Sequence, residues 1–136
     1  MRWTASLIRI AEHEIEGLRK RLGEIVERRH GCELRLVELA AEAAAEVERA
    51  REDAEAGWYL VGYRQGWTLR KERALAELSA VEREEEGARD ALSRAYEDLK
   101  KVEQVAESAR VAAAREDARR EGAALDELAL RRSVAE

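Results

Sequence analysis

The sequence predicts an all-α fold, a long antiparallel coiled-coil hairpin of two helices, and three observations lead to it. Charged residues make up 40% of the 136 residues, while aromatic residues make up 4% and proline is absent. Much of the 46% hydrophobic fraction is alanine, so the bulky side chains of a thick globular core are missing. Apolar residues recur at alternating spacings of three and four, the heptad pattern of supercoiled helices. We predict a single coiled-coil domain, with arm one at about 5–56, a hinge at about 57–66 and arm two at about 67–132.

The first arm carries one apolar seam, a row of heptad positions that faces a partner helix. Arg29 falls on this seam, where its long stem can pack while its charged head reaches solvent. Glycines at 17, 23 and 31 each lower helix stability by about 1 kcal/mol, so the arm needs tertiary support. Beyond Ala43 the apolar positions shift to Val47, Ala50 and Ala54, which locally unwinds a supercoil. The seam consists of Ile8, Ala11, Ile15, Leu18, Leu22, Ile25, Arg29, Cys32, Leu36, Leu39 and Ala43.

The hinge is predicted where the heptads give way to glycines and aromatics. Residues 57–67 hold three glycines and four of the six Trp and Tyr residues. Because glycine commonly ends helices and clustered glycines mark turns, we expect a bend near Gly57–Gly62 with the aromatics packed at its tip. The alternative is one continuous, kinked helix.

The second arm begins near Tyr63 or Trp67 and continues through an apolar series that is rich in alanine at its far end. Glu85 falls on the seam close to Gly87, which makes this stretch a weak point. We expect the helix to fray near residues 131–133. The series consists of Leu75, Leu78, Val81, Ala88, Leu92, Ala95, Leu99, Val102, Ala106, Ala109 and Ala113.

Folding the chain at this hinge pairs large side chains with small ones. Leu22 and Ile25 are expected opposite roughly Ala95 and Leu99, and residues 8–15 opposite the alanines of 106–113. Arms of this length give a rod of about 80–100 Å, with the second arm overhanging. Since each helix buries one stripe, we expect low stability alone and a gain on binding a partner.

Composition argues against several functions and compartments. The net charge of −5 is spread over both signs, so the chain lacks the basic footprint of a nucleic-acid-binding protein. A single cysteine, Cys32, favours a reducing compartment. No apolar run approaches the roughly 20 residues of a membrane span, and the N-terminus is too charged for a signal peptide. We therefore predict a cytoplasmic protein.

The sequence offers no catalytic or cofactor-binding pattern. His30 and Cys32 diverge on a helix, while zinc needs about four converging ligands. His13 lies among glutamates, and Gly62 and Gly66 lack the lysine and the strand of a phosphate-binding loop. We predict no enzyme activity, metal, cofactor or small-molecule substrate, because catalytic groups need a concave pocket.

Two sets of residues are candidates for partner binding. Trp67, Lys71, Ala74 and Leu78 share one helical stripe, and a large aromatic is a frequent interface anchor. The alternative is that this stripe is the core of the tip. The second set gathers toward the end of the hairpin that holds the termini, where it could enter an acidic opening, although ordinary solubility explains such charges equally well. This basic set is Arg2, Arg9, Arg119, Arg120, Arg131 and Arg132.

Three segments make the chain similar to the FliJ family of flagellar export proteins. They are Ser6-Leu7-Ile8-Arg9-Ile10, then Ala95-Tyr96-Glu97-Asp98-Leu99-Lys100-Lys101-Val102-Glu103, and Ala118-Arg119-Arg120-Glu121 followed by Leu125-Asp126-Glu127-Leu128-Ala129. The resemblance implies an antiparallel coiled coil in the cytoplasmic part of the flagellar type III export apparatus, peripheral to the inner membrane and serving motility. It implies a stalk that enters the hexameric export ATPase, couples it to the cytoplasmic domain of the membrane export gate and escorts export chaperones.

The resemblance also gives roles to the two candidate sets. The end that bears the termini would enter the ATPase ring, and a gate-contacting patch early in the second helix would fall on Trp67, Lys71, Ala74 and Leu78. Lys71 stands where the family has an apolar residue. The alternative function is a generic cytoplasmic coiled-coil scaffold or holdase chaperone without an ATPase partner.

Overall fold

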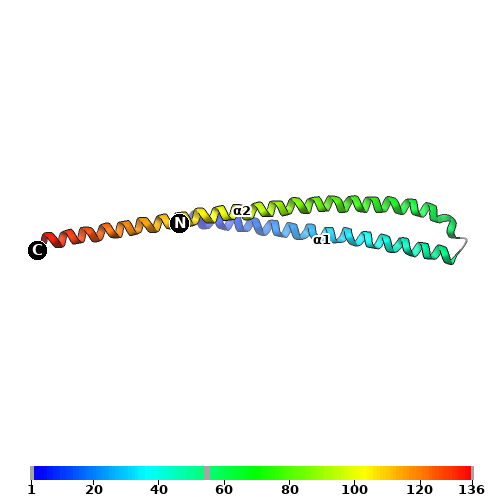
Figure 1. Cartoon of the computed structure of the whole chain (residues 1–136), viewed down its shortest axis with the longest axis horizontal. Coiled ribbons are helices and arrows are strands. Elements are labelled where there is room, and N and C mark those ends of the chain that lie inside the picture. Colours follow the sequence, from blue (N-terminus) through cyan, green and yellow to red (C-terminus); the bar gives the residue numbers. More distant parts are fainter. Residues whose placement is uncertain (1, 54–55, 136) are drawn as a thin grey trace. The chain divides into compact units, whose positions relative to one another are not determined.

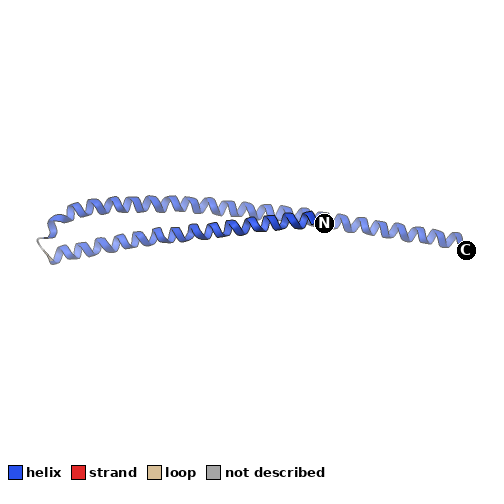
Figure 2. Cartoon of the chain, turned by 180° about the vertical axis from the view of Figure 1, so that it is seen from behind, coloured by secondary structure: helices blue, strands red, loops and turns tan. Residues whose placement is uncertain are grey.

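The computed structural model describes residues 2–53 and 56–135, and nearly all of them are helical. Helix α1 spans Arg2–Glu52, a short 3-10 helix, η1, spans Ala56–Tyr59, and α2 spans Leu60–Ala135 (Figure 1). The described residues contain no strand (Figure 2). The predicted all-α helical hairpin is confirmed.

The chain divides into two compact units. Unit 1 combines Met1–Glu16 with Ser93–Glu136, and unit 2 is the continuous segment Gly17–Leu92. Unit 2 therefore contains the helix break and the segments of α1 and α2 that flank it. Unit 1 contains the beginning of α1 and the long C-terminal part of α2.

The break between the helices lies earlier than the glycine cluster predicts. Helix α1 ends at Glu52, and the N–H of Asp53 still donates to the carbonyl of Arg49 at 3.1 Å. Residues 60–66, which were expected in the hinge, belong to α2. No glycine of the described ranges has a positive φ, so the break does not use glycine's access to left-handed backbone. Ala54, predicted as an apolar seam position, lies outside the described residues.

The heptad seam is the buried stripe of both helices. Every predicted α1 position from Ile8 to Ala50 is buried or half-buried, with Leu39 only 1% exposed. On α2, burial follows the predicted series up to Ala109, but Leu75 is 45% exposed and Ala113 is exposed. The expected fraying near 131–133 is wrong, because α2 continues to Ala135.

The core of unit 2 fixes how its two helix segments are aligned. Ile25 clusters with Val81 and Ala88, and Leu22 and Cys32 pack against this cluster. The expected register, with Leu22 and Ile25 opposite Ala95 and Leu99, is therefore wrong by about one heptad. The earlier break accounts for this shift, since moving the bend toward the N-terminus draws earlier α2 residues opposite α1.

Polar contacts tie the helices together beside the break. The hydroxyl of Tyr59 donates to Glu46 at 3.0 Å, and Arg70 pairs with Glu42 at 3.2 Å. The hydrogen bond to Glu46, then burial, raises the pKa of Tyr59. Both η1 and the first turns of α2 are thus held to the C-terminal part of α1 by charge-assisted bonds.

An ion-pair layer crosses the middle of unit 2. Nε of Arg29 lies 3.0 Å from Oε2 of Glu85, and the side chains are only 25% and 13% exposed. Arg29 also binds Glu33 at 2.7 Å, and Arg89 binds Glu85 at 3.2 Å. Burial raises the pKa of Glu85, but the hydrogen bond from Arg89 and the charge of Arg29 outweigh it, so this pKa is lower than usual.

The burial of Leu39 generates a stability prediction. Leu39→Ala removes the most deeply buried side chain and should lower the free energy of unfolding by about 2–5 kcal/mol, measured by urea denaturation followed by circular dichroism. Leu34→Ala is the matched control on the same helix, because Leu34 is 58% exposed and its truncation should change stability by about 0.5 kcal/mol or less. Equal losses in the two variants would contradict the observed seam.

The lowered pKa of Glu85 generates a pH prediction. Its carboxylate stabilises the folded state at neutral pH, and this contribution disappears as the pH falls through the folded-state pKa, below the ordinary value of about 4.3. The charged groups around it are Arg28, Arg29 and Glu33 on α1 and Glu84 and Arg89 on α2.

Thermal melts between about pH 7 and pH 3 test this contribution. Glu85→Gln should melt below the wild type at neutral pH, and its melting temperature should fall less on acidification. Glu121→Gln, on the exposed end of α2, should follow the wild-type profile. Parallel profiles for the wild type and Glu85→Gln would show that Glu85 is not linked to folding.

Candidate partner-binding surfaces

Trp67 is held inside unit 2 by its own indole. Its Nε1–H donates to the backbone carbonyl of Leu39 across the helix pair at 2.7 Å, and the side chain is half-buried. The ammonium of Lys71 lies 5.2 Å from the ring centroid, within cation–π range. Trp67 therefore contributes to the core of the tip, and Lys71 covers its ring.

The rest of the predicted stripe is divided between core and surface. Ala74 is only 7% exposed, Leu78 is half-buried and Lys71 is exposed. A partner that approaches from solvent meets Lys71 directly but reaches Ala74 only if the helices separate. Lys71 lies beside the seam, because the half-buried residue on this turn of α2 is Arg70. The guanidinium of Arg70 is 5.9 Å from the centroid of the Tyr63 ring.

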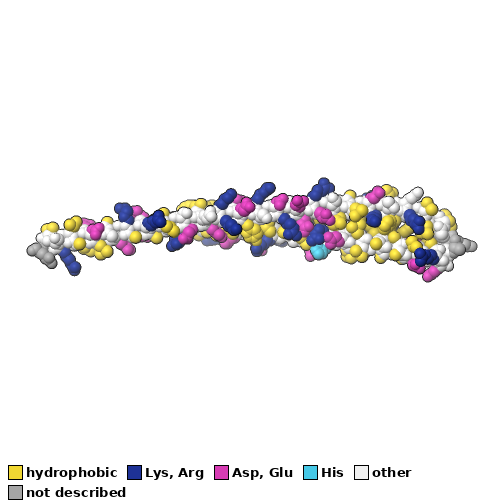
Figure 3. Space-filling model, viewed as in Figure 1, with side chains coloured by type: hydrophobic (Ala, Val, Ile, Leu, Met, Phe, Trp, Pro, Cys, Tyr) yellow, Lys and Arg dark blue, Asp and Glu magenta, His cyan; other side chains and the backbone are white. Residues whose placement is uncertain are grey.

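The apolar surface near the break lies on residues outside the predicted stripe. Figure 3 shows hydrophobic side chains gathered over the part of unit 2 next to the break. The signal was present in the sequence as a second apolar series, residues 34, 37, 41 and 44, with three-four spacing outside the seam. The large exposed side chains are Leu34, Val37, Trp58, Val61, Leu69 and Leu75.

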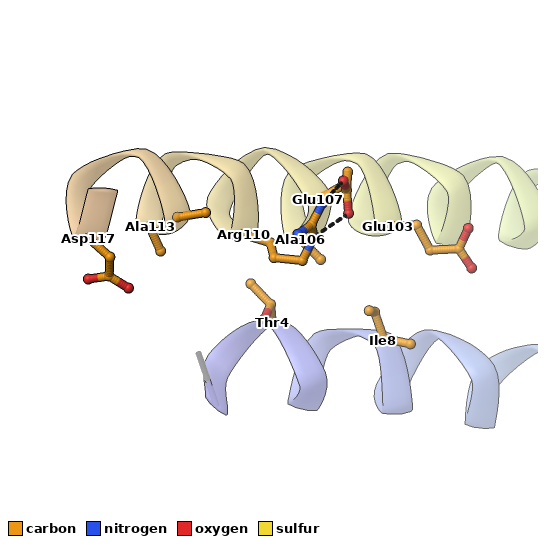
Figure 4. A pocket seen from close by; sticks show the side chains of 9 residues that line it. Thr4, Ile8, Glu103, Ala106, Glu107, Arg110, Ala113 and Asp117 are labelled. Carbon is orange, nitrogen blue, oxygen red and sulfur yellow. Dashed lines mark hydrogen bonds and ion pairs between the residues drawn. The ribbon is translucent and has the colours of Figure 1, made fainter. Parts of the chain in front are cut away.

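The basic set lies in unit 1, with Arg2 and Arg9 on α1 and the other four arginines spread along α2. Thr4 on α1 lines the same groove as Ala106 and Asp117 on α2 (Figure 4), so Arg131 lies 14 residues, about 20 Å of helix, beyond that contact. The expectation that these arginines gather at one end is corrected accordingly. Arg9 is exposed on α1, and Arg132 forms no ion pair with any described residue.

Three of these arginines are paired with nearby acids. Arg119 and Arg120 both bind Glu116, at 2.8 and 3.3 Å, and Arg131 binds Glu127 at 2.9 Å. The hydrogen bond from Arg119 lowers the pKa of Glu116. The part of α2 that carries these arginines has no net positive charge, because its acids equal its bases in number. Residues 117–135 carry four acids and four bases, namely Asp117, Glu121, Asp126 and Glu127 with Arg119, Arg120, Arg131 and Arg132.

The C-terminal part of α2 exposes every side chain that the structure describes beyond Glu116. Four of these are large and apolar: Leu125, Leu128, Leu130 and Val134, which are 57–86% exposed. We call residues 117–135 the unpaired end.

Where α1 does lie against α2 in unit 1, the contact leaves a shallow groove. Thr4 and Ile8 face residues 103–117 across it, and Arg110 and Glu107 form a 2.6 Å ion pair on its wall (Figure 4). Ile8, Ala106 and Ala113 line this groove together.

The two histidines differ from the cysteine in their exposure. His13 and His30 are exposed, and Cys32 is half-buried against the unit 2 core. Within residues 2–53 and 56–135, no group of three or more His, Cys, Asp or Glu side chains is placed to hold a metal ion. No helix in those ranges has a stretch long and apolar enough to cross a bilayer.

The two roles of Trp67 can be separated by a conservative substitution. Trp67→Phe keeps an aromatic ring but removes the donor to Leu39, and it should lower the free energy of unfolding by about 0.5–1.5 kcal/mol in urea denaturation. Trp58→Phe is the control, because Trp58 is 83% exposed and should leave stability unchanged. An unchanged midpoint for Trp67→Phe would indicate that the indole does not tie the helices.

Comparison with known proteins gives a full-length match. The chain is 51% identical over 133 residues to the Flagellar FliJ protein of Caulobacter vibrioides, in strain NA1000 / CB15N and in strain ATCC 19089 / CIP 103742 / CB 15. The alignment covers 98% of this chain and 96% of each relative. No family model and no solved structure matches. Identity at this level over nearly the whole length places the chain in the flagellar FliJ protein family.

Proposed function

We propose that this protein is a non-catalytic component of the bacterial flagellar type III export apparatus. In this proposal it is a coiled-coil stalk that binds the hexameric export ATPase, couples it to the cytoplasmic domain of the membrane export gate and helps to escort export chaperones. It acts in the cytoplasm, peripherally at the inner membrane. Membership of the FliJ family supports the setting, and the unpaired end of α2 is the observation that carries the mechanism.

The unpaired end suits insertion into a ring. It is a single helix, about 10–12 Å across with its side chains, whereas a helix pair is roughly twice as wide. Its leucines and Val134 give it apolar surface, and its acids and bases are equal in number. Binding in this proposal therefore depends on burying apolar side chains more than on net charge, and Arg131 and Arg132 supply contacts at the rim.

The gate contact is proposed for the surface of unit 2 near the break. Lys71 and the exposed side chains of Leu69 and Leu75 are accessible there, while Ala74 is buried. In this arrangement Trp67 and Leu78 support the surface from within the helix pair and are not its outermost contacts.

The alternative function is a cytoplasmic scaffold or holdase without an ATPase partner. The exposed apolar side chains beside the seam and those of the unpaired end also suit a protein that shields unfolded chains. The two functions differ in one measurable respect, because only the stalk changes the activity of the export ATPase.

Truncation after Glu116 tests the proposal. It removes the unpaired end and leaves the segment of α2 that lies against Thr4 and Ile8 largely intact. We expect the full chain to bind the purified export ATPase and raise its ATP hydrolysis, and the truncated chain to bind at least about tenfold more weakly, because apolar anchors dominate interface energy. The measurements are ATPase rate and binding by surface plasmon resonance.

A matched pair of variants separates apolar from charged contacts. Leu125→Gln with Leu128→Gln should reproduce most of the truncation's effect while the helix persists, whereas Arg131→Gln with Arg132→Gln should weaken binding less. Circular dichroism controls for helicity. A helical full-length chain that neither binds nor stimulates the ATPase would reject the stalk and leave the scaffold or holdase.

A further inference from the structure

The middle of the seam in unit 2 contains one charged residue from each helix, Arg29 and Glu85, and the two face each other. Among the described seam positions from Ile8 to Ala50, Arg29 alone is charged, and from Leu78 to Ala109 Glu85 alone is charged. Their side chains are 25% and 13% exposed and meet at 3.0 Å. Apolar layers lie on both sides of this ion pair. Ile25 and Ala88 form the layer on one side, and Cys32 and Val81 form the layer on the other side.

We propose that the Arg29–Glu85 pair sets the register of the hairpin. An antiparallel pair of heptad helices can slide by seven residues and still place seam against seam, because the pattern repeats. The observed and the slipped registers differ in which residue faces Arg29 and which residue faces Glu85.

Both one-heptad slips place each charge opposite a leucine. In one direction Arg29 faces Leu92 and Glu85 faces Leu36, and in the other Arg29 faces Leu78 and Glu85 faces Leu22. In either slip each charge loses its partner across the seam and keeps only its neighbour on the same helix, Glu33 for Arg29 and Arg89 for Glu85. Placing a half-buried charge against a leucine is unfavourable, whereas the leucines displaced by the slip gain little. The observed register is therefore the one in which both charges keep a partner across the seam.

The contact depends on charge more than on a directed hydrogen bond. Nε of Arg29 is buried and makes no hydrogen bond with any described residue, although it lies close to Glu85. A neighbouring pair, Arg28 and Glu84 at 2.8 Å, has the same charges but lies on the rim, 56% and 44% exposed. In a slipped register those exposed side chains turn to water, so the rim pair does not select register and serves as the control.

The natural Cys32 provides a reporter of register. Cys32 packs against the cluster that contains Val81 and lines one groove with it, so a cysteine at position 81 reports the observed register. A cysteine at 88 or 74 reports the two slipped registers, because seven residues of helix, about 10 Å, lie outside disulfide reach. Val81→Cys, Ala88→Cys and Ala74→Cys are oxidised at low protein concentration, and the intramolecular bridge is quantified by mass spectrometry.

The bridges are compared in four backgrounds. The wild-type seam should give the bridge to position 81 alone. With Arg29→Leu and Glu85→Leu together, the chain should stay helical but the bridges to 88 and 74 should rise at least about tenfold, since register then rests on equivalent apolar layers. The exchanged pair, Arg29→Glu with Glu85→Arg, should restore the wild-type pattern of bridges. The rim control, Arg28→Leu with Glu84→Leu, should retain that pattern.

The outcome that overturns the proposal is an exclusive bridge to position 81 in the double-leucine chain, since register would then be set elsewhere, for example by Trp67. A slipped pattern in the rim control would equally overturn it, because exposed charges would be sufficient. Circular dichroism of each variant establishes that the chain is folded, and the exchanged pair tests the same contact without the leucine substitutions. None of these measurements involves the export ATPase, so the result is independent of the proposed function.

Discussion

The structure depends on one narrow stripe of side chains on each helix. A globular core surrounds its residues on all sides, but here a seam residue has a partner on one face only, and few are fully buried. Leu39, Ile25, Val81 and Ala88 are among the few buried apolar side chains of unit 2 that the structure describes. With so little burial to distribute, polar ties such as those of Tyr59, Trp67 and Arg29 count for more than they would in a thick core.

The parts of the fold that the sequence predicts are those that follow from local periodicity. Three-four spacing identifies which face of each helix is buried, because that face is a property of the helix itself, and every α1 seam position from Ile8 to Ala50 follows it. The position of the break and the register of the two helices do not follow from local periodicity, since they depend on which α2 residue contacts which α1 residue. Glycine propensity alone places the bend at residues 57–66, yet Gly62 and Gly66 remain helical. Arg29 and Glu85 were each recognised on a seam, and considering them as a pair would have selected the observed alignment.

The candidate sites show the same division between local and non-local information. A stripe of Trp67, Lys71, Ala74 and Leu78 is visible in the sequence, but spacing does not reveal whether it faces a partner protein or the chain's own first helix. The structure shows that Trp67 donates to Leu39 and that Ala74 is buried, and both facts require the position of α1. The acidic partners of Arg119, Arg120 and Arg131, by contrast, lie three or four residues away and are readable directly from the sequence.

Register and the unpaired end of α2 are connected by helix length. Helix α1 has 51 residues and α2 has 76, so the alignment of the pair determines how much of α2 extends beyond it. A slip of one heptad would lengthen or shorten the unpaired end by seven residues, about 10 Å. An isolated helix of this length is marginally stable in water, and local pairs such as Glu127 with Arg131 contribute only about 0.2–0.5 kcal/mol each. A partner that encloses the unpaired end would supply the missing burial, so under the proposed function its affinity would depend on the length of that end.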